Sequence, residues 1–241
     1  MATFKVTGII IKRMNLGEAD RILTVVTKEK GKIKVLAKGV RRTLSKLAGN
    51  LELFCLSNLV IAEGRNLDIV TAAEIKKCFI NLRGNLSCTQ AAFYFAEMIE
   101  QLSEEDEPNT ETFNLLDDVL ENLNTIQSDI LIPYFEWNLL TELGYHPELS
   151  DCLECHVKVE EKELIYFSVS RGGIICVNCQ KEDLKITAST VKLLRLFLKH
   201  QILALTKIQL NEKVLREVKK ITRLYLNQTS DKEFRSQRFL K

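Results

Sequence analysis

The 241-residue sequence is poor in the residues that interrupt packed structure, with only three prolines and ten glycines. This scarcity argues against long linkers and low-complexity segments. The first 21 residues hold an apolar run of only three, Ile9 to Ile11, which is too short for a signal peptide or a membrane span. Seven cysteines, an odd number, do not suit a secreted disulfide framework. We therefore expect a soluble cytoplasmic protein in a reducing compartment, with no membrane partner.

The sequence also lacks the motifs of the common enzyme classes. It contains no phosphate-cradling glycine loop, no G-x-S-x-G and no H-E-x-x-H. His146 and His200 have no partner at a useful spacing, and paired carboxylates occur only in acidic runs. No residue set supplies a nucleophile, a base and a group that orients the base. We expect a protein that is not an enzyme.

Cations are almost missing from the middle of the chain. Residues 81–150 carry one Lys or Arg against 14 acidic residues, a net charge of −13. Residues 1–80 have a net charge of +8 and residues 151–241 a net charge of +7. The net negative charge of the middle segment excludes it as a nucleic-acid surface, whereas either basic end could serve as one.

The basic stretch from Gly31 to Lys46 stands out within the first segment. Lys32, Lys34 and Lys38 alternate with apolar residues, which predicts a strand with one buried face and one basic, solvated face. Gly39 breaks the strand, and Arg41 and Arg42 follow it. This pattern suits a phosphate backbone. It equally suits an edge strand protected by lysines, so the pattern alone leaves both interpretations open.

Five short strands are predicted in the first 80 residues, at about 6–12, 21–27, 31–38, 51–62 and 67–73. Tight hairpins join several of them, with Gly31 able to take a positive φ in the turn 28–31. This pattern is typical of a small barrel or sandwich, and a five-stranded Greek-key barrel is one member of that class.

Helices are predicted for most of the remaining chain. A capping box, Ser87 with Gln90, would begin a helix that reaches Leu102; a second covers 113–123, and a third begins at Pro133 and stops at Gly144. Apolar residues at helical spacing continue over 191–198 and 214–225. The last helix has a basic polar side that could complement the acidic middle or contact DNA: Lys213, Arg216, Lys219, Lys220 and Arg223.

Four cysteines form two C-x-x-C knuckles, Cys152 with Cys155 and Cys176 with Cys179, separated by 20 residues. This spacing predicts a four-thiolate zinc site, which is structural because it leaves no open coordination position. Cys155-His156 completes a c-type haem attachment motif, but the second knuckle explains the first more economically. Cys55 and Cys78 stand alone in apolar context and are expected in the core.

The chain resembles the RecO family of bacterial recombination mediators in several blocks. Near the N-terminus these are Gly17-Glu18-Ala19-Asp20-Arg21, Thr27 to Lys32 and Ala37 to Arg42. Leu139-Leu140-x-x-Leu143-Gly144 before the knuckles, Gly172-Gly173 before the second knuckle, and the closing Phe234-Arg235-Ser236-x-x-Phe239-Leu240 are also similar. The resemblance covers nearly the whole chain.

The resemblance implies an α+β, multi-domain fold. It places an OB-fold β-barrel at 1–80, a helical domain at 81–150 and 184–241, and an inserted zinc ribbon at 151–183. It also implies a recombinational repair mediator that binds single- and double-stranded DNA, anneals complementary strands and helps to load recombinase. The implied partners are RecR, the acidic C-terminal tail of single-strand binding protein, and RecF, near the bacterial nucleoid.

The residues expected to contact phosphates all lie in the first 46: Lys12, Arg13, Arg21, Lys32, Lys34, Lys38, Arg41, Arg42 and Lys46. Residues 1–80 contain only three aromatic residues, Phe4, Phe54 and Phe79, and none is interleaved with the basic strand. Many OB-folds stack bases on aromatic rings, so we expect binding dominated by the phosphate backbone. The alternative is a non-catalytic scaffold that docks proteins on a basic barrel and a zinc ribbon.

Overall fold

The computed structural model describes residues 2–79, 82, 84–123, 125, 126, 128–160, 164–208 and 211–240. The chain divides into two compact units. Unit 1 comprises Met1–Asn124 together with Phe234–Lys241, and unit 2 comprises Thr125–Glu233. The predicted strand segment and the first two predicted helices therefore fall in one unit, and the cysteine knuckles fall in the other.

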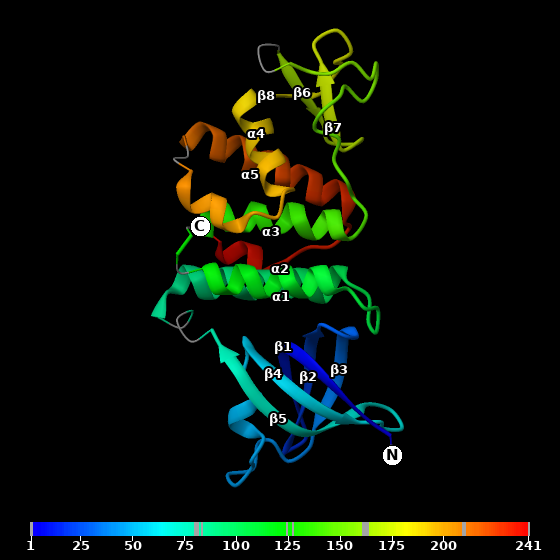
Figure 1. Cartoon of the computed structure of the whole chain (residues 1–241), viewed down its shortest axis with the longest axis vertical. Coiled ribbons are helices and arrows are strands. Elements are labelled where there is room, and N and C mark those ends of the chain that lie inside the picture. Colours follow the sequence, from blue (N-terminus) through cyan, green and yellow to red (C-terminus); the bar gives the residue numbers. More distant parts are fainter. Residues whose placement is uncertain are drawn as a thin grey trace. The chain divides into compact units, whose positions relative to one another are not determined.

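Unit 1 contains five strands that form a closed sheet. They are β1 (Thr3–Leu16), β2 (Asp20–Thr27), β3 (Gly31–Ala37), β4 (Cys55–Ala62) and β5 (Asp68–Cys78). The order is β1-β2-β3-β5-β4, and β1 also pairs with β4. All neighbours are antiparallel except β3 and β5, whose short parallel pairing joins Val35 to Asp68 and Leu36 to Ile69. Figure 1 shows these strands in blue and cyan.

The barrel closes around alternating apolar residues, as the period-two pattern predicts. Its core includes Val6, Ile10, Leu23, Val25, Ile33, Val35, Leu59, Ile61 and Val70. The β2–β3 hairpin turns at Gly31, whose φ is +65°. A side chain there would also meet the Glu107 carbonyl oxygen, since a Cβ would lie 1.8 Å from it. Glycine is thus required at this turn for two separate reasons.

Two details of the barrel differ from the sequence-based expectation. The fourth strand begins at Cys55 rather than Leu51, because a short 3-10 helix, η1 (Ala48–Asn50), precedes it. Cys55 and Cys78 are also not lone core thiols, since they form a disulfide with a Cα–Cα distance of 4.1 Å. The register of β4 against β5 places these two residues opposite each other. The expectation of two unpaired thiols was therefore wrong. A separation of 23 residues in the sequence does not reveal the strand register that brings the two cysteines together.

Two helices complete the first part of unit 1: α1 (Leu86–Leu102) and α2 (Thr110–Asn122). The prediction of a capping box at Ser87 was wrong. Asn85 is the N-cap of α1, and its side chain accepts hydrogen bonds from the backbone N–H groups of Ser87 and Cys88. Asn109 caps α2 in the same way, through the N–H of Thr112. The acidic loop 103–109 lies between the two helices.

The C-terminal residues return to unit 1 through the 3-10 helix η4 (Arg235–Phe239). The Glu97 carboxylate accepts hydrogen bonds from the backbone N–H groups of Arg235, at 2.9 Å, and Ser236, at 2.8 Å. Phe234 is buried and packs edge-on against Tyr94, with ring centroids 5.9 Å apart. Burial raises the pKa of Glu97, but the hydrogen bonds from Ser236 and Arg235 outweigh it, so the pKa lies below its ordinary value.

Unit 2 is built from α3 (Ser128–Glu142), α4 (Ala188–Phe197), the 3-10 helix η3 (Ile202–Lys207) and α5 (Glu212–Thr229). The expectation that a helix begins at Pro133 was wrong, because α3 starts at Ser128. Trp137 lies at the centre of the unit. Its ring stacks on Tyr225 with centroids 5.0 Å apart, and its indole N–H donates to the Thr222 hydroxyl at 2.7 Å.

A small three-stranded sheet carries the cysteine knuckles. Its strands are β6 (Ile165–Ser168), β7 (Gly173–Cys176) and β8 (Leu184–Ile186), in the order β7-β6-β8. Phe167 of β6 meets both Trp137 and Tyr225 edge-on, with each pair of centroids 6.0 Å apart. This aromatic cluster joins the sheet to α3 and α5 within unit 2. In the described part of the chain, no helix is both long and apolar enough to cross a bilayer.

Candidate nucleic-acid interface and metal centre

Lys32 is the second residue of β3, but it does not face solvent. Only 6% of the residue is exposed, and its ammonium group donates to the main-chain oxygens of Glu100, at 2.6 Å, and Ser103. Both carbonyls belong to the C-terminal end of α1, where a cation is favourable to the helix dipole. Burial lowers the pKa of Lys32, and the nearby Glu105 carboxylate opposes that shift. The prediction of a solvated basic face was therefore wrong at this residue.

Three further cations of the expected DNA surface form ion pairs inside unit 1. Lys34 pairs with Glu105, and Lys12 pairs with Glu100. Arg13 lies 2.8 Å from the Glu52 carboxylate. A hydrogen bond to Glu105 raises the pKa of Lys34. Carboxylates of the acidic segment thus pair with Lys12 and Lys34, and a barrel carboxylate pairs with Arg13, which offsets the charge of these three cations. The sequence signal for this was the acidic run 104–107, whose partners in the barrel we did not assign.

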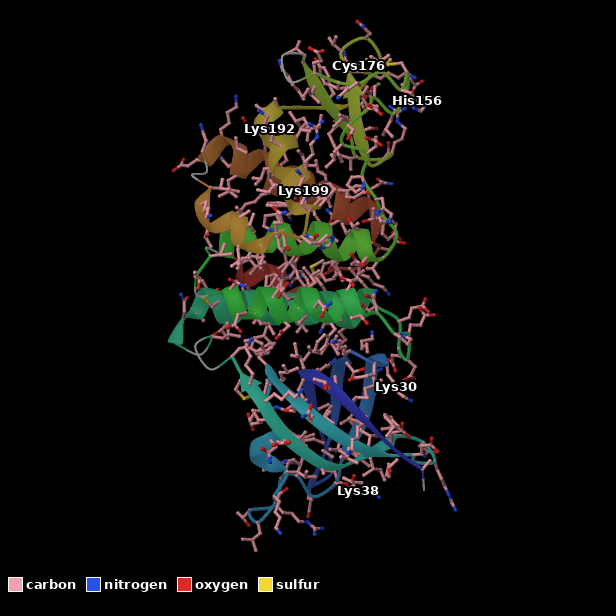
Figure 2. The ribbon with its side chains drawn as sticks, viewed as in Figure 1. Lys30, Lys38, His156, Cys176, Lys192 and Lys199 are labelled. Atoms are coloured by element: carbon pink, nitrogen blue, oxygen red, sulfur yellow. A yellow bond between two sulfur atoms is a disulfide. The ribbon has the colours of Figure 1, made fainter. Side chains whose placement is uncertain are left out.

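The remaining five cations lie at the ends of strands or in the loop after β3. Lys38, Arg41, Arg42 and Lys46 are exposed, and Arg21 is half-buried on β2. Within the described ranges, none of these five forms an ion pair with a carboxylate. Figure 2 shows Lys38 at the end of the barrel away from α1. We call residues 38–46 the basic loop.

The basic loop is held in place by its backbone and by one apolar anchor. Gly39 has a φ of +62°, and its N–H donates to the Asp20 carboxylate at 2.7 Å. Val40 is buried, and the backbone N–H of Arg41 donates to the Ala19 oxygen at 2.9 Å. The Arg41 guanidinium donates to the Gly17 carbonyl at 3.0 Å. These contacts fix the loop backbone while the side chains of Lys38, Arg42 and Lys46 stay free to reach an anion.

Exposed apolar residues lie at the same end of the barrel. Met14 and Leu16 are 51% and 44% exposed at the end of β1, and Leu44 in the basic loop is 94% exposed. In the strand register, Leu16 lies opposite Asp20 and Met14 opposite Ile22, next to Arg21. Composition alone did not indicate these residues, because single apolar side chains in a strand are normally assigned to the core. Apolar side chains beside cations can contact sugars and bases while the cations contact phosphates.

In unit 2 the structure brings Cys152, Cys155, Cys176 and Cys179 together as the knuckle spacing predicts. Their sulfur atoms all lie within 4.8 Å of one another, and the Cys155 and Cys176 sulfurs are 3.8 Å apart. A tetrahedron with metal–sulfur bonds of about 2.3 Å has edges of about 3.8 Å. The donor set and its size therefore suit a single tetrahedrally coordinated metal ion.

Backbone hydrogen bonds shape each knuckle. The N–H of His156 donates to the Cys152 oxygen at 2.9 Å, and the N–H of Cys179 to the Cys176 oxygen at 3.2 Å. His156 itself is exposed and has a positive φ of 57°, in keeping with a turn residue rather than a ligand. The Cys176 N–H points at the Cys152 sulfur, 3.4 Å away. Such N–H donors stabilise thiolate ligands.

The thiol pKa values indicate that four thiolates in this cluster need a bound cation. Burial raises the pKa of Cys152, but backbone N–H donors around it outweigh burial and bring the pKa to about 6. The hydrogen bond to Cys176 and the other thiols raise the pKa of Cys179 to about 12. One thiolate forms readily, whereas four adjacent thiolates need a cation to offset their mutual repulsion. A bound divalent metal ion would supply that charge.

Family comparisons cover both units. The model described as "Recombination protein O N terminal" matches residues 1–79, and the one described as "Recombination protein O C terminal" matches residues 83–238. The chain belongs to the RecO family. As a RecO-family member, it has a role in DNA repair and recombination.

Curated relatives agree with this assignment over more than nine tenths of their length. A protein of Dehalococcoides mccartyi named "DNA repair protein RecO" is 38% identical over 233 residues, covering 95% of this chain and 92% of that protein. A protein of the same name from Thermoanaerobacter sp. is 32% identical and covers 100% of this chain and 98% of its own length. In Acetivibrio thermocellus the corresponding values are 31%, 100% and 97%. The RecO resemblance seen in the sequence is thus confirmed.

Proposed function

We propose that this RecO-family chain binds DNA through the phosphate backbone at the basic loop and anneals complementary strands. One observation carries this proposal. Lys38, Arg42 and Lys46 are exposed on a loop whose backbone is fixed, and within the described ranges they have no carboxylate partner. An unpaired, clustered positive charge attracts a polyanion at long range and gains from counterion release. Gripping phosphates leaves base edges free, which is what pairing of two strands requires.

We assign the barrel to the OB-fold class. The support is its closed order, β1-β2-β3-β5-β4, with a single parallel pairing between β3 and β5. The class is a five-stranded Greek-key barrel that often binds nucleic acids. We also infer that the four cysteines hold one structural zinc ion, since four thiolates in a tetrahedron are typical of that metal. Such a site would stabilise the small sheet and would leave no open position for catalysis at the metal. Because the sequence also offers no nucleophile with a base and an orienting group, we infer that the chain is not an enzyme.

The loop assignment is tested by comparing two double variants of the full-length protein. Lys38→Gln with Arg42→Gln removes two exposed cations, whereas Lys12→Gln with Lys34→Gln removes two that are paired with Glu100 and Glu105. Arg41 is left unchanged because it also donates to the Gly17 carbonyl. Binding of a mixed-sequence single-stranded oligonucleotide is measured by fluorescence polarisation at several salt concentrations.

We expect the loop variant to lower the slope of log K against log salt by about 1.4, which is about 0.7 for each lost phosphate contact. The Lys12 and Lys34 variant should change the slope little. Equal effects of both variants would show that the DNA-contact surface includes Lys12 and Lys34 as well as the basic loop. A loop variant that binds with an unchanged slope would remove the basic loop from the DNA surface. It would then favour the scaffold alternative, in which the loop docks an acidic protein.

We further propose that the chain acts with RecR, RecF and single-strand binding protein to load recombinase. A cavity of about 590 Å³ in unit 1 is a candidate receiver for the acidic C-terminal tail of single-strand binding protein. Phe93 and Phe239 supply apolar surface, being 45% and 62% exposed, and Arg235 contributes a cation at its edge. Phe93→Ala should weaken capture of a fluorescent tail peptide without changing the affinity for naked DNA. A tail peptide that binds Phe93→Ala as tightly as the unchanged protein would place its site elsewhere.

A further inference from the structure

The exposed face of α5 carries a line of cations in unit 2. Arg216, Lys220 and Arg223 are all exposed and follow each other at spacings of four and three residues, which places them on one side of a helix. The opposite side of α5 is buried through Val218, Ile221, Thr222, Tyr225 and Leu226. The orientation of the cationic face is therefore fixed by the packing of the rest of the helix.

The cations of this line are not neutralised by ion pairs with the described acidic residues of unit 2. Lys219, on the flank of α5, does pair with Asp129. Burial raises the pKa of Glu217, but hydrogen bonds from Thr190 and Thr187, with a smaller effect from Lys213, bring it below its ordinary value. By contrast, in the described part of unit 2 the Arg216 side chain donates to the Glu212 main-chain oxygen, at 3.4 Å, and to no carboxylate. Across the residues described here, Lys220 and Arg223 form no ion pair. The prediction that this face complements the acidic helices thus applies to Lys219 and not to the exposed line.

A groove of about 990 Å³ lies between α5 and the cysteine-bearing sheet. Lys220 and Gln228 line it from α5, and Ser170 lines it from the β6–β7 turn. The sheet adds three cations and two acids, Arg171, Lys181, Lys185, Glu182 and Asp183. Arg171 is paired with Glu154, and Asp183 accepts a hydrogen bond from the Lys181 N–H at 3.2 Å. Cations outnumber acids along the groove, and Lys181, Lys185 and Lys220 remain exposed.

The shape of this surface favours an extended polyanion over a single phosphate. From Arg216 to Gln228 the helix rises about 18 Å, at about 1.5 Å per residue, so the line and the groove together exceed the reach of one phosphate group. Phe167, the aromatic residue that lines the groove, is fully buried and offers no stacking face. Side chains that hydrogen-bond phosphates and sugars, such as Gln228 and Ser170, lie beside the cations.

We propose that α5 and the cysteine-bearing sheet form a second nucleic-acid surface that holds a single DNA strand by its phosphates. The inference rests on the proposed function for the class of ligand, but it concerns different residues in a different unit. A chain with one surface on each unit can carry two strands at once. Complementary strands repel each other through their phosphates, and cations on both surfaces reduce that repulsion while the bases stay free to pair.

The test uses the full-length, metal-loaded protein and two matched triple variants of unit 2. Arg216→Gln, Lys220→Gln and Arg223→Gln together remove the cationic line. Lys199→Gln, Lys207→Gln and Lys232→Gln remove three exposed cations that do not line the groove. Figure 2 labels Lys199, which follows α4. Gln is a good helix former, and unchanged metal content and circular dichroism verify that each variant is folded.

Two quantities are measured: binding of a mixed-sequence 30-nucleotide strand at several salt concentrations, and annealing of two complementary strands. We expect the α5 variant to lower the slope of log K against log salt by about 2, because three phosphate contacts worth about 0.7 each are lost. At 0.1 M salt, that change in slope corresponds to a loss of affinity of about a hundredfold. Annealing should slow with it. The control variant should match the unchanged protein in both measurements. Glu182→Gln should raise affinity, because it removes a carboxylate from the groove.

The outcomes separate this inference from the proposed function of the basic loop. An α5 variant that binds and anneals like the control overturns the second surface, whatever the loop variant does. A loop variant without effect beside a weakened α5 variant would reject the loop and leave the second surface standing. If the α5 variant keeps its DNA affinity but loses binding of a polyglutamate peptide, the groove is a site for an acidic protein segment and the inference is wrong.

Discussion

The Lys32 ammonium group donates to the main-chain oxygen of Glu100 at 2.6 Å, across 68 residues of sequence. This contact ties β3 of the barrel to the end of α1. It also explains why a strand with two lysines does not form a uniformly basic surface, since Lys34 is paired with Glu105 nearby. Positive charge available to DNA is thereby displaced to the basic loop that follows the strand.

Replacing Lys32 should affect stability more than DNA binding. In Lys32→Met the carbonyls of Glu100 and Ser103 lose a buried donor, and we expect the free energy of unfolding to fall by about 1–3 kcal/mol. Urea unfolding measures this loss. Lys38→Met is the matched control, with a stability change within about 0.5 kcal/mol and weaker DNA binding. A Lys32→Met protein that is fully stable but binds DNA weakly would show that Lys32 contacts phosphate.

The contact between Glu97 and the C-terminal segment should depend on pH. Since the pKa of Glu97 is lowered in the folded protein, its contribution to stability is full above the unfolded-state pKa and disappears as pH falls through the folded value. At pH 7, Glu97→Gln should lower the free energy of unfolding by about 1 kcal/mol, less than for a fully buried charge because the carboxylate is half-exposed.

The difference between Glu97→Gln and the unchanged protein should shrink as the pH falls below about 4, near the ordinary Glu pKa. Denaturation at pH 7 and at pH 3 measures it, with Glu104→Gln in the exposed acidic loop as the control. A stability gap that stays constant between the two pH values would mean that the Glu97 charge does not hold the segment.

Metal content should follow the knuckle cysteines and not the other thiols. We expect about one zinc ion per chain in the purified protein and none in Cys152→Ser, because the remaining three thiolates lose the closed tetrahedral set. Cys88→Ser is the control, since that buried thiol donates to the Leu123 oxygen in unit 1. Metal analysis of the purified proteins tests this zinc content. A chelator should also lower the stability of the unchanged protein strongly, because a structural site contributes roughly 10 kcal/mol of apparent binding free energy. A folded unchanged protein without metal would contradict it.

Gly172 should couple energetically to Tyr225. Gly172 has a φ of +69°, and a Cβ there would lie 2.7 Å from the Tyr225 hydroxyl. Gly172→Ala should therefore lower stability by about 1–2 kcal/mol through the left-handed backbone alone, and further through the clash. The cost should be smaller in the Tyr225→Phe background, which lacks the hydroxyl. Equal costs in a double-mutant cycle would show that the two residues do not interact.

Local patterns in the sequence predicted most elements of the fold. The turn at Gly31 and the alternation along β2 and β3 follow from residues that are near neighbours, so the structure is set within a short segment. The two C-x-x-C knuckles lie 20 residues apart, but their repeated spacing is itself a signal for one four-thiolate site. The N-cap of α1 shows the limit of this reasoning, because Ser87 and Asn85 both have capping side chains and only the backbone conformation selects Asn85.

Features that depend on long-range contacts could not be predicted in the same way. The disulfide between Cys55 and Cys78 requires the register of two strands. The burial of Lys32 requires α1 to end beside β3. For the same reason, composition showed that the chain has basic and acidic segments but not which charges neutralise each other.

The return of residues 234–240 to α1 has a consequence for synthesis of the protein. Unit 1 is made first, but it lacks Phe234 and the partners of Glu97 until all of unit 2 has left the ribosome. At about 5–20 residues per second, the 109 residues between Thr125 and Glu233 take on the order of 10 s to translate. During that interval Tyr94 and the surface of α1 stay uncovered. The apolar surface that Phe234 covers in the finished protein is therefore exposed on the nascent chain until the last residues are made.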